Sequence, residues 1–132
     1  EALKALFAPN ALAKSKDIDN QIEGLMNLYK GKFISNSPFD SGGSTGHQQW
    51  GKWIYLTISP NIYELKTDEA AYSMIFDAIP VDAENPDDVG LWRIILWTNI
   101  DKKRKKEEKG EYVMPDCEVG YSYEGRANEL DD

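Results

Sequence analysis

The stretch Trp53–Ile58 (WIYLTI), together with Ala71–Phe76 (AYSMIF) and Leu91–Trp97 (LWRIILW), decides the fold. All three runs lie between Gln49 and Ile100, and each is bounded by Pro, Gly, Asn or Asp. They alternate polar and apolar residues and are rich in β-branched and aromatic side chains. This pattern is typical of antiparallel strands whose two faces meet different environments.

Further runs of the same kind extend this β region in both directions. The sequence predicts a mainly β, antiparallel domain: a lipocalin- or calycin-like curled sheet or barrel of about seven strands, preceded by one or two short helices. Two loops are expected, a Gly/Ser-rich one over 36–48 and an acidic one from Pro80 to Gly90. The expected strands are Lys32–Ser35, Trp50–Ser59, Ile62–Lys66, Ala70–Ile79, Leu91–Ile100, Glu111–Met114 and Cys117–Glu124.

The N-terminal part of the chain is predicted to be helical. Residues 17–30 place Ile18, Ile22, Leu25, Met26 and Tyr29 at spacings of three and four, which predicts one apolar stripe on a helix. Either Ser15 or Asp17 can cap this helix, and Gly31 can end it. The resulting division is an N-terminal arm (1–16), a helix plus β-barrel domain (17–126) and a polar tail (127–132).

Composition limits the classes of function. The chain has 132 residues, 41% hydrophobic and 29% charged, which fits one globular domain. The net charge of −8 argues against nucleic acid as a partner, because phosphate binding needs a dense positive surface. No apolar run approaches the roughly 18 residues of a transmembrane helix, although a peripheral place on a membrane complex stays open. The single cysteine, Cys117, favours a reduced compartment, either cytoplasm or plastid stroma.

Few residues suit catalysis or metal binding. His47 and Cys117 are the only side chains of their kinds and lie far apart in the sequence, so we predict no metal site. His47 is expected in a flexible loop, and Cys117 is expected to be a core thiol. Glu64, Asp77 and Glu118 could still turn inward for acid–base work, although nothing distinguishes them from outward-facing charges. On balance we expect a protein that is not an enzyme.

Two groups of residues remain as binding candidates. The aromatic content suggests a pocket, for whose ligand-binding lining we choose Trp53, Tyr55 and Trp97, although ordinary core packing explains these rings equally well. The second group is a basic run that reads either as a solvated hairpin tip or as a docking site for an acidic partner. It consists of Lys102, Lys103, Arg104, Lys105 and Lys106.

Four short motifs carry a resemblance to a known family. They are Leu28–Phe33 (LYKGKF), Gly51–Tyr55 (GKWIY), Pro115–Val119 (PDCEV) and Tyr123–Gly125 (YEG). In their order the chain resembles the T-type phycobiliprotein chromophore lyases (the CpcT/CpeT family), which form a lipocalin-like calyx. That family continues its Trp-Tyr strand with Glu-Gln and then has an Arg-rich strand, whereas this chain has Leu56-Thr57 and no arginine in Tyr72–Phe76. The resemblance therefore implies the scaffold, with no catalytic residue carried over.

Our leading hypothesis is a non-catalytic accessory or structural subunit that docks on a larger protein assembly. The resemblance implies that this assembly is a pigment–protein complex of photosynthesis. The contact residues would be Leu3, Leu6 and Phe7 of the arm, with Lys102 to Lys106 of the basic run. The alternatives are a lipocalin-like carrier, whose ligand would be a bilin, another tetrapyrrole or another apolar molecule, and an active chromophore lyase.

Overall fold

The fold is taken from a computed structural model that describes residues 3–122, except for the side chains of 39–43. The predicted tail (127–132), the YEG motif and the end of the expected strand 117–124 lie outside the described residues. The helical elements are η1 (Lys4–Leu6), α1 (Pro9–Lys14), α2 (Ile18–Leu28), η2 (Pro86–Asp88) and α3 (Ile100–Glu108). The strands are β1 (Phe33–Asn36), β2 (Phe39–Gln49), β3 (Lys52–Thr67), β4 (Ala71–Asp82), β5 (Gly90–Trp97) and β6 (Cys117–Gly120).

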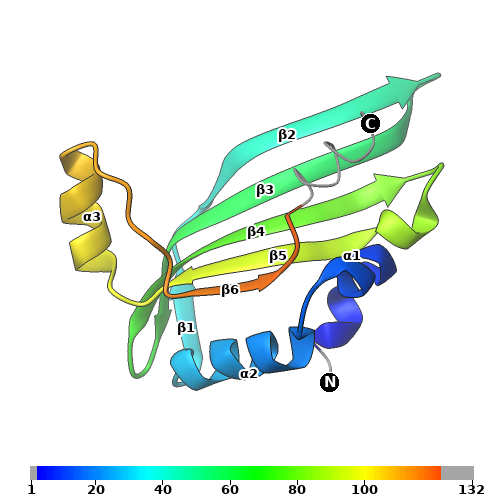
Figure 1. The fold of residues 1–132 in the computed structure, drawn as a ribbon. Helices are drawn as coiled ribbons and strands as arrows, with labels where there is room; N and C mark the ends of the chain where they lie inside the picture. Colours follow the sequence, from blue (N-terminus) through cyan, green and yellow to red (C-terminus); the bar gives the residue numbers. More distant parts are fainter. Residues whose placement is uncertain (1–2, 123–132) are drawn as a thin grey trace.

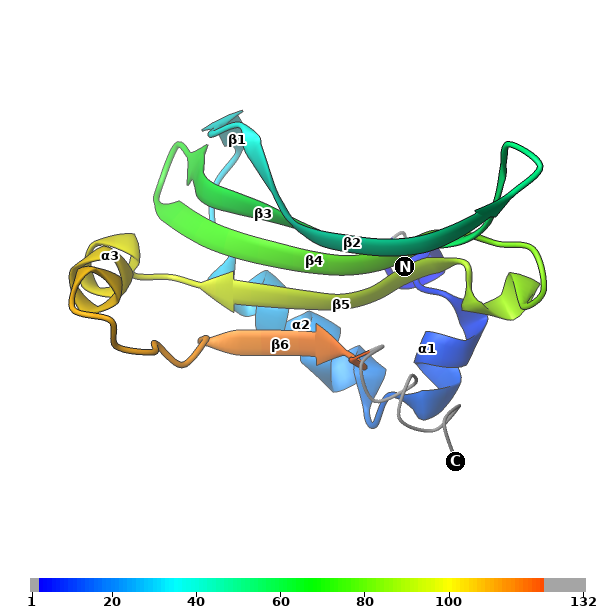
Figure 2. The same cartoon turned by 90° about the horizontal axis from the view of Figure 1, so that it is seen from above.

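The described strands form one six-stranded antiparallel sheet in the order β1-β3-β4-β5-β6. Strand β2 lies on the same side of β3 as β1, because β1 pairs with residues 65–67 of β3 and β2 with residues 52–62. The strands are long and bend toward one side, so the sheet is curled but stays open (Figures 1 and 2). The predicted mainly β, curled antiparallel fold is thereby confirmed.

The main core lies between one face of this sheet and the N-terminal helices. Trp92 and Leu96 of β5 and Val119 of β6 are fully buried there, and Ile22 of α2 packs against the same cluster. The N-terminal segment takes part in this core. Phe7 is buried, and the backbone N–H of Ala8 donates to Leu91 O at 2.9 Å, so this segment continues the sheet beside β5.

Helix α2 forms where the apolar periodicity predicts it. Ile18, Ile22 and Leu25 are buried, as expected for the inner stripe of an amphipathic helix. Asp17 stands at the N-cap position with φ 59°, but its carboxylate makes no capping bond to the backbone. Instead, Asp17 Oδ2 accepts from Asn20 Nδ2 at 2.7 Å. The helix start is therefore set mainly by the burial of the stripe.

Strand β2 replaces the loop that we expected over 36–48. Apart from Phe39 and Thr45, its residues are glycines, serines and other polar residues, which have low strand propensity on their own. The hydrogen-bonding edge of β3 overrides that preference, since β2 pairs with it from Phe39↔Ile62 to Gln49↔Lys52. Pairing with a strong neighbouring strand is a tertiary effect that local sequence does not reveal.

Strand β3 is continuous, where the sequence predicted two strands separated at Pro60. Proline has no N–H to donate, so it normally interrupts the middle of a sheet. Here the pairing with β2 shifts register between Ser41 and Ser44, next to the pair Ser41↔Pro60. The ladder is therefore irregular beside Pro60, and β3 continues through the proline.

Helix α3 replaces the solvated hairpin tip that we expected at the basic run. Asn99 caps it, with Oδ1 accepting from the Lys102 backbone N–H at 3.0 Å. Lysine, arginine and glutamate all favour helix, so the run forms a helix before β6. Strand β5 accordingly ends at Trp97, and the expected strand Glu111–Met114 is an irregular connection.

Candidate functional site

The inner face of the curled sheet is apolar beyond the area that the helices cover. Ile62 and Met74 are paired across β3 and β4 and are buried in the core. Every second residue along each strand lies on this same face, and the register shift between Ile58 and Leu56 brings Val81 rather than Pro80 opposite Leu56. The face therefore continues away from the helices as a row of aliphatic and aromatic side chains. We call these residues the hollow face: Leu56, Ile58 and Pro60 of β3, with Phe76, Ala78 and Val81 of β4.

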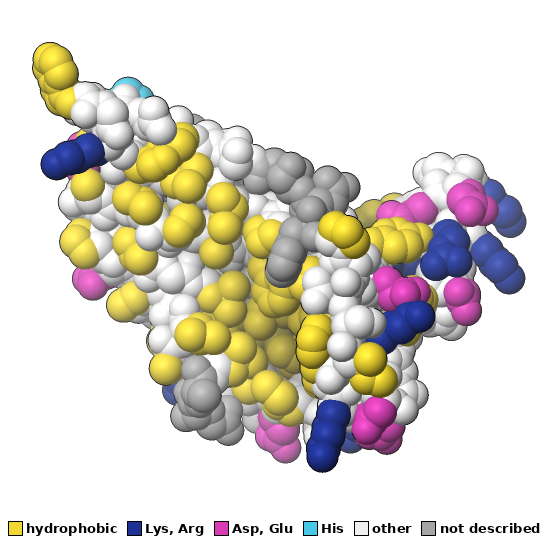
Figure 3. All heavy atoms as spheres, turned by 180° about the vertical axis from the view of Figure 1, so that it is seen from behind, with side chains coloured by type: hydrophobic (Ala, Val, Ile, Leu, Met, Phe, Trp, Pro, Cys, Tyr) yellow, Lys and Arg dark blue, Asp and Glu magenta, His cyan; other side chains and the backbone are white. Residues whose placement is uncertain are grey.

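All six side chains of the hollow face are half-buried. Phe76 packs against the main core and so connects it to the open part of the face. Figure 3, which views the molecule from behind, shows hydrophobic side chains gathered in a hollow on the inner side of the curl. Contiguous apolar surface that is open to solvent is a common feature of binding sites.

The indole of Trp53 borders the hollow face at the end nearer the β2–β3 turn. A Cβ at Gly46 would stand 2.5 Å from the Trp53 ring and 3.1 Å from Leu56 Cδ1. Glycine is therefore required at position 46, because it leaves space for the indole to lie across β2. Trp53 remains 42% exposed, so this ring is available to a bound molecule.

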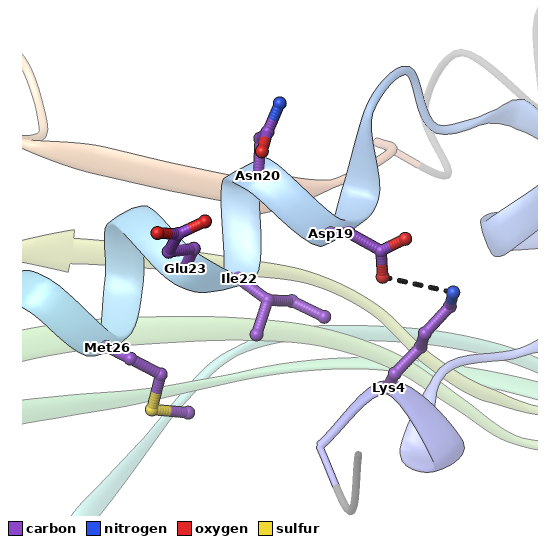
Figure 4. A pocket seen from close by; sticks show the side chains of 6 residues that line it. All are labelled: Lys4, Asp19, Asn20, Ile22, Glu23 and Met26. Atoms are coloured by element: carbon purple, nitrogen blue, oxygen red, sulfur yellow. Dashed lines mark ion pairs between the residues drawn. The ribbon is translucent and has the colours of Figure 1, made fainter.

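Helix α2 lies along β6, at the edge of the sheet away from β2. Gln21 Oε1 accepts from the Gly120 N–H at 2.9 Å, which turns that flank of the helix toward β6. Figure 4 shows Ile22 and Met26 pointing away from β6. A pocket of about 410 Å³ lies beside α2, on the side where Ile22 and Met26 point. At one end of this pocket, Lys4 Nζ forms an ion pair with Asp19 Oδ1 at 3.0 Å. Its lining residues are Lys4, Asp19, Asn20, Ile22, Glu23 and Met26.

The three residues chosen for ligand binding do not meet. Trp53 borders the hollow face, but Tyr55 points to the opposite face, where its ring stacks with His47 at 6.5 Å. Trp97 is buried beneath α3, and its Nε1 donates to Val113 O at 3.0 Å. The sequence pattern did not assign these aromatic residues to faces of the sheet.

The residues chosen for partner contact differ in accessibility. Phe7 is buried and Leu3 is partly buried, whereas Leu6 is 63% exposed. In α3, the Lys103 ammonium lies 4.7 Å from the Trp97 ring and 5.4 Å from the Tyr63 ring, and it pairs with Glu107 at 2.9 Å.

The other basic side chains of α3 remain at the surface. Lys102, Arg104 and Lys105 are exposed and Lys106 is half-buried. Arg104 Nε donates to the Tyr63 hydroxyl at 3.2 Å, and this hydrogen bond raises the pKa of the guanidinium. Lys103 and Arg104 thus connect α3 to the sheet, while Lys102 and Lys105 are exposed to solvent.

Groups with chemical reactivity are separated or already paired. His47 lies on β2 and Cys117 on β6, toward opposite edges of the sheet. Burial, together with the nearby Glu118 and Asp116 carboxylates, raises the pKa of the Cys117 thiol, so it stays protonated at neutral pH. Asp77 is buried and accepts from Arg93 Nε and Ser59 Oγ, both at 2.7 Å. Within residues 3–122, no three His, Cys, Asp or Glu side chains gather closely enough to hold a metal ion.

Comparison with known proteins places the chain in a family. The family model described as a domain of unknown function, DUF5104, matches residues 1–106. The chain belongs to the DUF5104 family. The matched part of this DUF5104 chain includes both strands of the hollow face and the whole of α2. No curated protein matches the chain. The resemblance to the T-type lyases therefore stays a hypothesis.

Sequence reasoning missed the hollow face, although a signal for it was present. Ile54, Leu56 and Ile58 alternate with Trp53, Tyr55 and Thr57, so both faces of β3 are semi-apolar. Either both faces are covered within the domain, or one of them meets a partner. None of the helices in the described part of the chain is long and apolar enough to cross a membrane.

Proposed function

We propose that this domain is a non-catalytic docking subunit that holds a segment of a partner protein against the hollow face. One observation carries this proposal: six apolar side chains continue the core surface in a hollow and are left half-exposed. Removing apolar surface from water is worth roughly 25 cal/mol per Å². A partner that covered this face would therefore gain binding energy that the isolated domain leaves unused.

The reactive groups support binding rather than turnover. A nucleophile needs a base within hydrogen-bond reach, and Cys117 and His47 lie on strands at opposite sides of the sheet. Asp77 is held by Arg93 and Ser59, which suits a structural role. The exposed cations of α3 offer a second contact for an acidic surface of the same assembly.

The nature of the assembly rests on the resemblance alone. If the domain shares the scaffold of the T-type lyases, the larger complex would be a pigment–protein complex of the photosynthetic apparatus. The proposed compartment is the cytoplasm or a plastid stroma, in keeping with the lone thiol at Cys117.

A carrier of an apolar ligand is the second candidate, and the position of Trp53 favours it. An indole at the border of an apolar hollow is suited to stack on a flat molecule such as a tetrapyrrole. The hollow is open along the sheet, however, whereas small-molecule sites usually enclose most of their ligand. This openness makes a protein segment the better occupant.

Site-specific photo-cross-linking in the native cells tests the proposal. Phe76 on the hollow face and Tyr55 on the opposite face are each replaced by p-benzoylphenylalanine, a matched pair of aromatic positions. We expect a discrete protein adduct from position 76 and none from position 55. Adding Ile58→Asp to the position-76 variant should abolish the adduct. Absence of an adduct at 76, or equal adducts at both positions, would contradict the proposal, and a small-molecule adduct would favour the carrier.

A further inference from the structure

We infer that two copies of this chain associate through the outer edge of β2, with the two β2 strands antiparallel across a two-fold axis at Gly46. The Trp53 indoles of the two copies would lie side by side at that axis. This edge is separate from the hollow face, so the association does not depend on the docking function proposed above. Four features support it: the open edge, the direction of its peptide groups, its lack of charge and the position of Trp53.

The outer edge of β2 is open over the half of the strand next to the turn. Within residues 3–122, β2 pairs with β3 alone. Strand β1 does not cover this edge, because it pairs with residues 65–67 at one end of β3, whereas residues 44–49 of β2 pair with residues 52–58. Figure 1 shows β2 as the outermost strand along this stretch. All residues from 44 to 49 are exposed.

The peptide groups of alternate residues point outward from this edge. The carbonyl oxygen of Thr45 accepts from Thr57 Oγ1 at 3.1 Å, so Thr45 directs its peptide groups toward β3. Residues 44–49 are regular in β2, since the register shift within this stretch skips a residue of β3. Neighbouring residues of an extended strand direct their N–H and C=O groups to opposite sides. The residues whose groups point away from β3 are therefore Ser44, Gly46 and Gln48.

Hydrogen bonding and charge together select the occupant of the edge. Outward N–H and C=O groups match the backbone of another extended strand. Residues 41–51 contain no Asp, Glu, Lys or Arg and no Pro, the residues with which proteins usually protect a free edge. The chain has a net charge of −8, so two copies repel each other across most of their surfaces. At this edge two copies can meet without placing like charges opposite each other.

An axis at Gly46 uses all the outward groups of the regular stretch. A two-fold axis perpendicular to the sheet makes two identical strands antiparallel, which is the arrangement of the existing sheet. Gly46 then lies opposite Gly46 of the second copy, and Ser44 lies opposite Gln48 of the second copy. Each such pair can exchange two N–H···O bonds, so the interface gains about six main-chain hydrogen bonds. Thr45 comes opposite His47 of the second copy, at a position without main-chain bonds.

The Trp53 indole adds apolar contact at the axis. A Cβ at Gly46 would stand 2.5 Å from this ring, so the indole lies over Gly46 on its side-chain side. Because the axis is perpendicular to the sheet, the second indole lies over its own Gly46 on the same face. The Cα atoms of such a pair are about 5.5 Å apart, and aromatic rings interact at roughly 4.5–7 Å between centroids. The association would therefore cover part of the Trp53 surface, which is 42% exposed in the single chain.

Sedimentation velocity of the full chain at several concentrations tests this association. We expect a reversible dimer with a dissociation constant on the order of 10 µM, since the interface is small. Circular dichroism checks the fold of each variant described below. A chain that stays monomeric at about 500 µM, well above the expected constant, would overturn the inference.

Charge variants test the pairing of Ser44 with Gln48. Ser44→Lys combined with Gln48→Lys places lysines opposite each other and should weaken dimerisation by about tenfold, as should the corresponding pair of substitutions to Glu. Ser44→Lys combined with Gln48→Glu creates opposite charges at the same positions and should strengthen dimerisation by about fivefold. An equimolar mixture of the two like-charged variants should recover dimers. If all these variants dimerise as the original chain does, the contact lies elsewhere and the inference is wrong.

Disulfide cross-linking and a tryptophan variant locate the axis. Residues opposite each other without main-chain bonds have Cα atoms about 4.5 Å apart, which a disulfide can span. Thr45→Cys combined with His47→Cys should therefore give linked dimers with diamide as the oxidant, and either single variant should give few. Trp53→Ala should weaken dimerisation by about tenfold, whereas Tyr112→Ala, at a 75% exposed aromatic residue outside β2 and β3, should not change it. Equal cross-linking by the single variants, or no effect of Trp53→Ala, would contradict the proposed axis.

Discussion

At the scale of single residues, Trp50 stands out because its local conformation opposes its identity. Trp50 and Gly51 form the two-residue turn between β2 and β3, with φ values of 55° and 77°. This type of hairpin turn strongly prefers Asn-Gly, because a side chain with φ > 0 is sterically disfavoured unless it is Gly, Asn or Asp. The Trp50 side chain is 93% exposed and so gains nothing from packing.

Replacing this residue should stabilise the domain. We expect Trp50→Asn to raise the free energy of unfolding by about 1 kcal/mol, since asparagine tolerates the left-handed conformation. Urea unfolding followed by circular dichroism measures the change. Trp50→Val is the control, because a β-branched residue is still less suited to φ > 0 and should lower stability. Equal stabilisation by both substitutions would show that strain is not the cause.

At the scale of elements, α2 depends on one buried stripe and contains a glycine, Gly24, that weakens the helix. Gly24 lies on the outer side of the helix, and a Cβ there would meet nothing within 4 Å. The glycine therefore serves no close contact with the sheet. It only adds conformational freedom to the unfolded chain.

Gly24→Ala should accordingly stabilise the domain by about 0.5–1 kcal/mol, the difference in helix propensity between the two residues. Thermal unfolding measures the effect. Gly120→Ala is the contrasting control, because Gly120 has φ 103° and a Cβ there would overlap Trp92 O. That variant should be strongly destabilised. Destabilisation by Gly24→Ala would mean that this face of α2 is covered in the native state.

Helix α3 is attached through a cation and two aromatic rings. We expect Lys103→Ala to destabilise the domain by about 2 kcal/mol, because the ammonium over Trp97 and Tyr63 is desolvated and paired. Lys105→Ala, at an exposed position of the same helix, should change stability by less than about 0.5 kcal/mol. Urea unfolding followed by tryptophan fluorescence compares the two. Equal effects would show that α3 is held by other contacts.

At the scale of the whole molecule, the N-terminal segment completes the core rather than extending from it. Phe7 is 4% exposed and pairs with Leu91 of β5, and Asn10 Nδ2 donates to Asp88 Oδ1 at 2.7 Å. Leu6, the preceding residue, is 63% exposed. Leu6 and Phe7 are therefore adjacent in the sequence but differ in burial. The same substitution at each position can be compared.

Phe7→Asp should unfold the domain or destabilise it by more than about 4 kcal/mol, because it removes a buried ring and buries a charge. Leu6→Asp should leave the midpoint of thermal unfolding within a few degrees of the original. Near-ultraviolet circular dichroism and thermal scans distinguish these outcomes. A folded Phe7→Asp variant would show that the segment is an arm that detaches from the core.

Alternation and periodicity were sufficient to predict the parts of this molecule that are specified locally. The apolar stripe of α2 and the central runs of β3, β4 and β5 follow directly from side-chain spacing, and so does the curled antiparallel class. Turn-forming composition misled the prediction at β2, since a glycine-rich strand forms only beside a strong partner. The dense charge of residues 102–106 led to the prediction of a solvated hairpin tip where α3 forms. The capping residue Asn99 and the helix-favouring residues after it were signals for this helix in the sequence.

The sequence by itself determined that both faces of Trp53–Ile58 are apolar and that the chain carries few reactive groups. Only the tertiary structure decided which of those faces the helices cover, and that Leu56, Ile58 and Phe76 remain as an open hollow. The physical reason is that alternation predicts which residues share a face only where the strands pair regularly. The register shifts that bring Trp53 and Val81 to the side of Leu56, the bend of the sheet and the position of α2 decide the rest. Those properties arise from contacts between segments far apart in the chain.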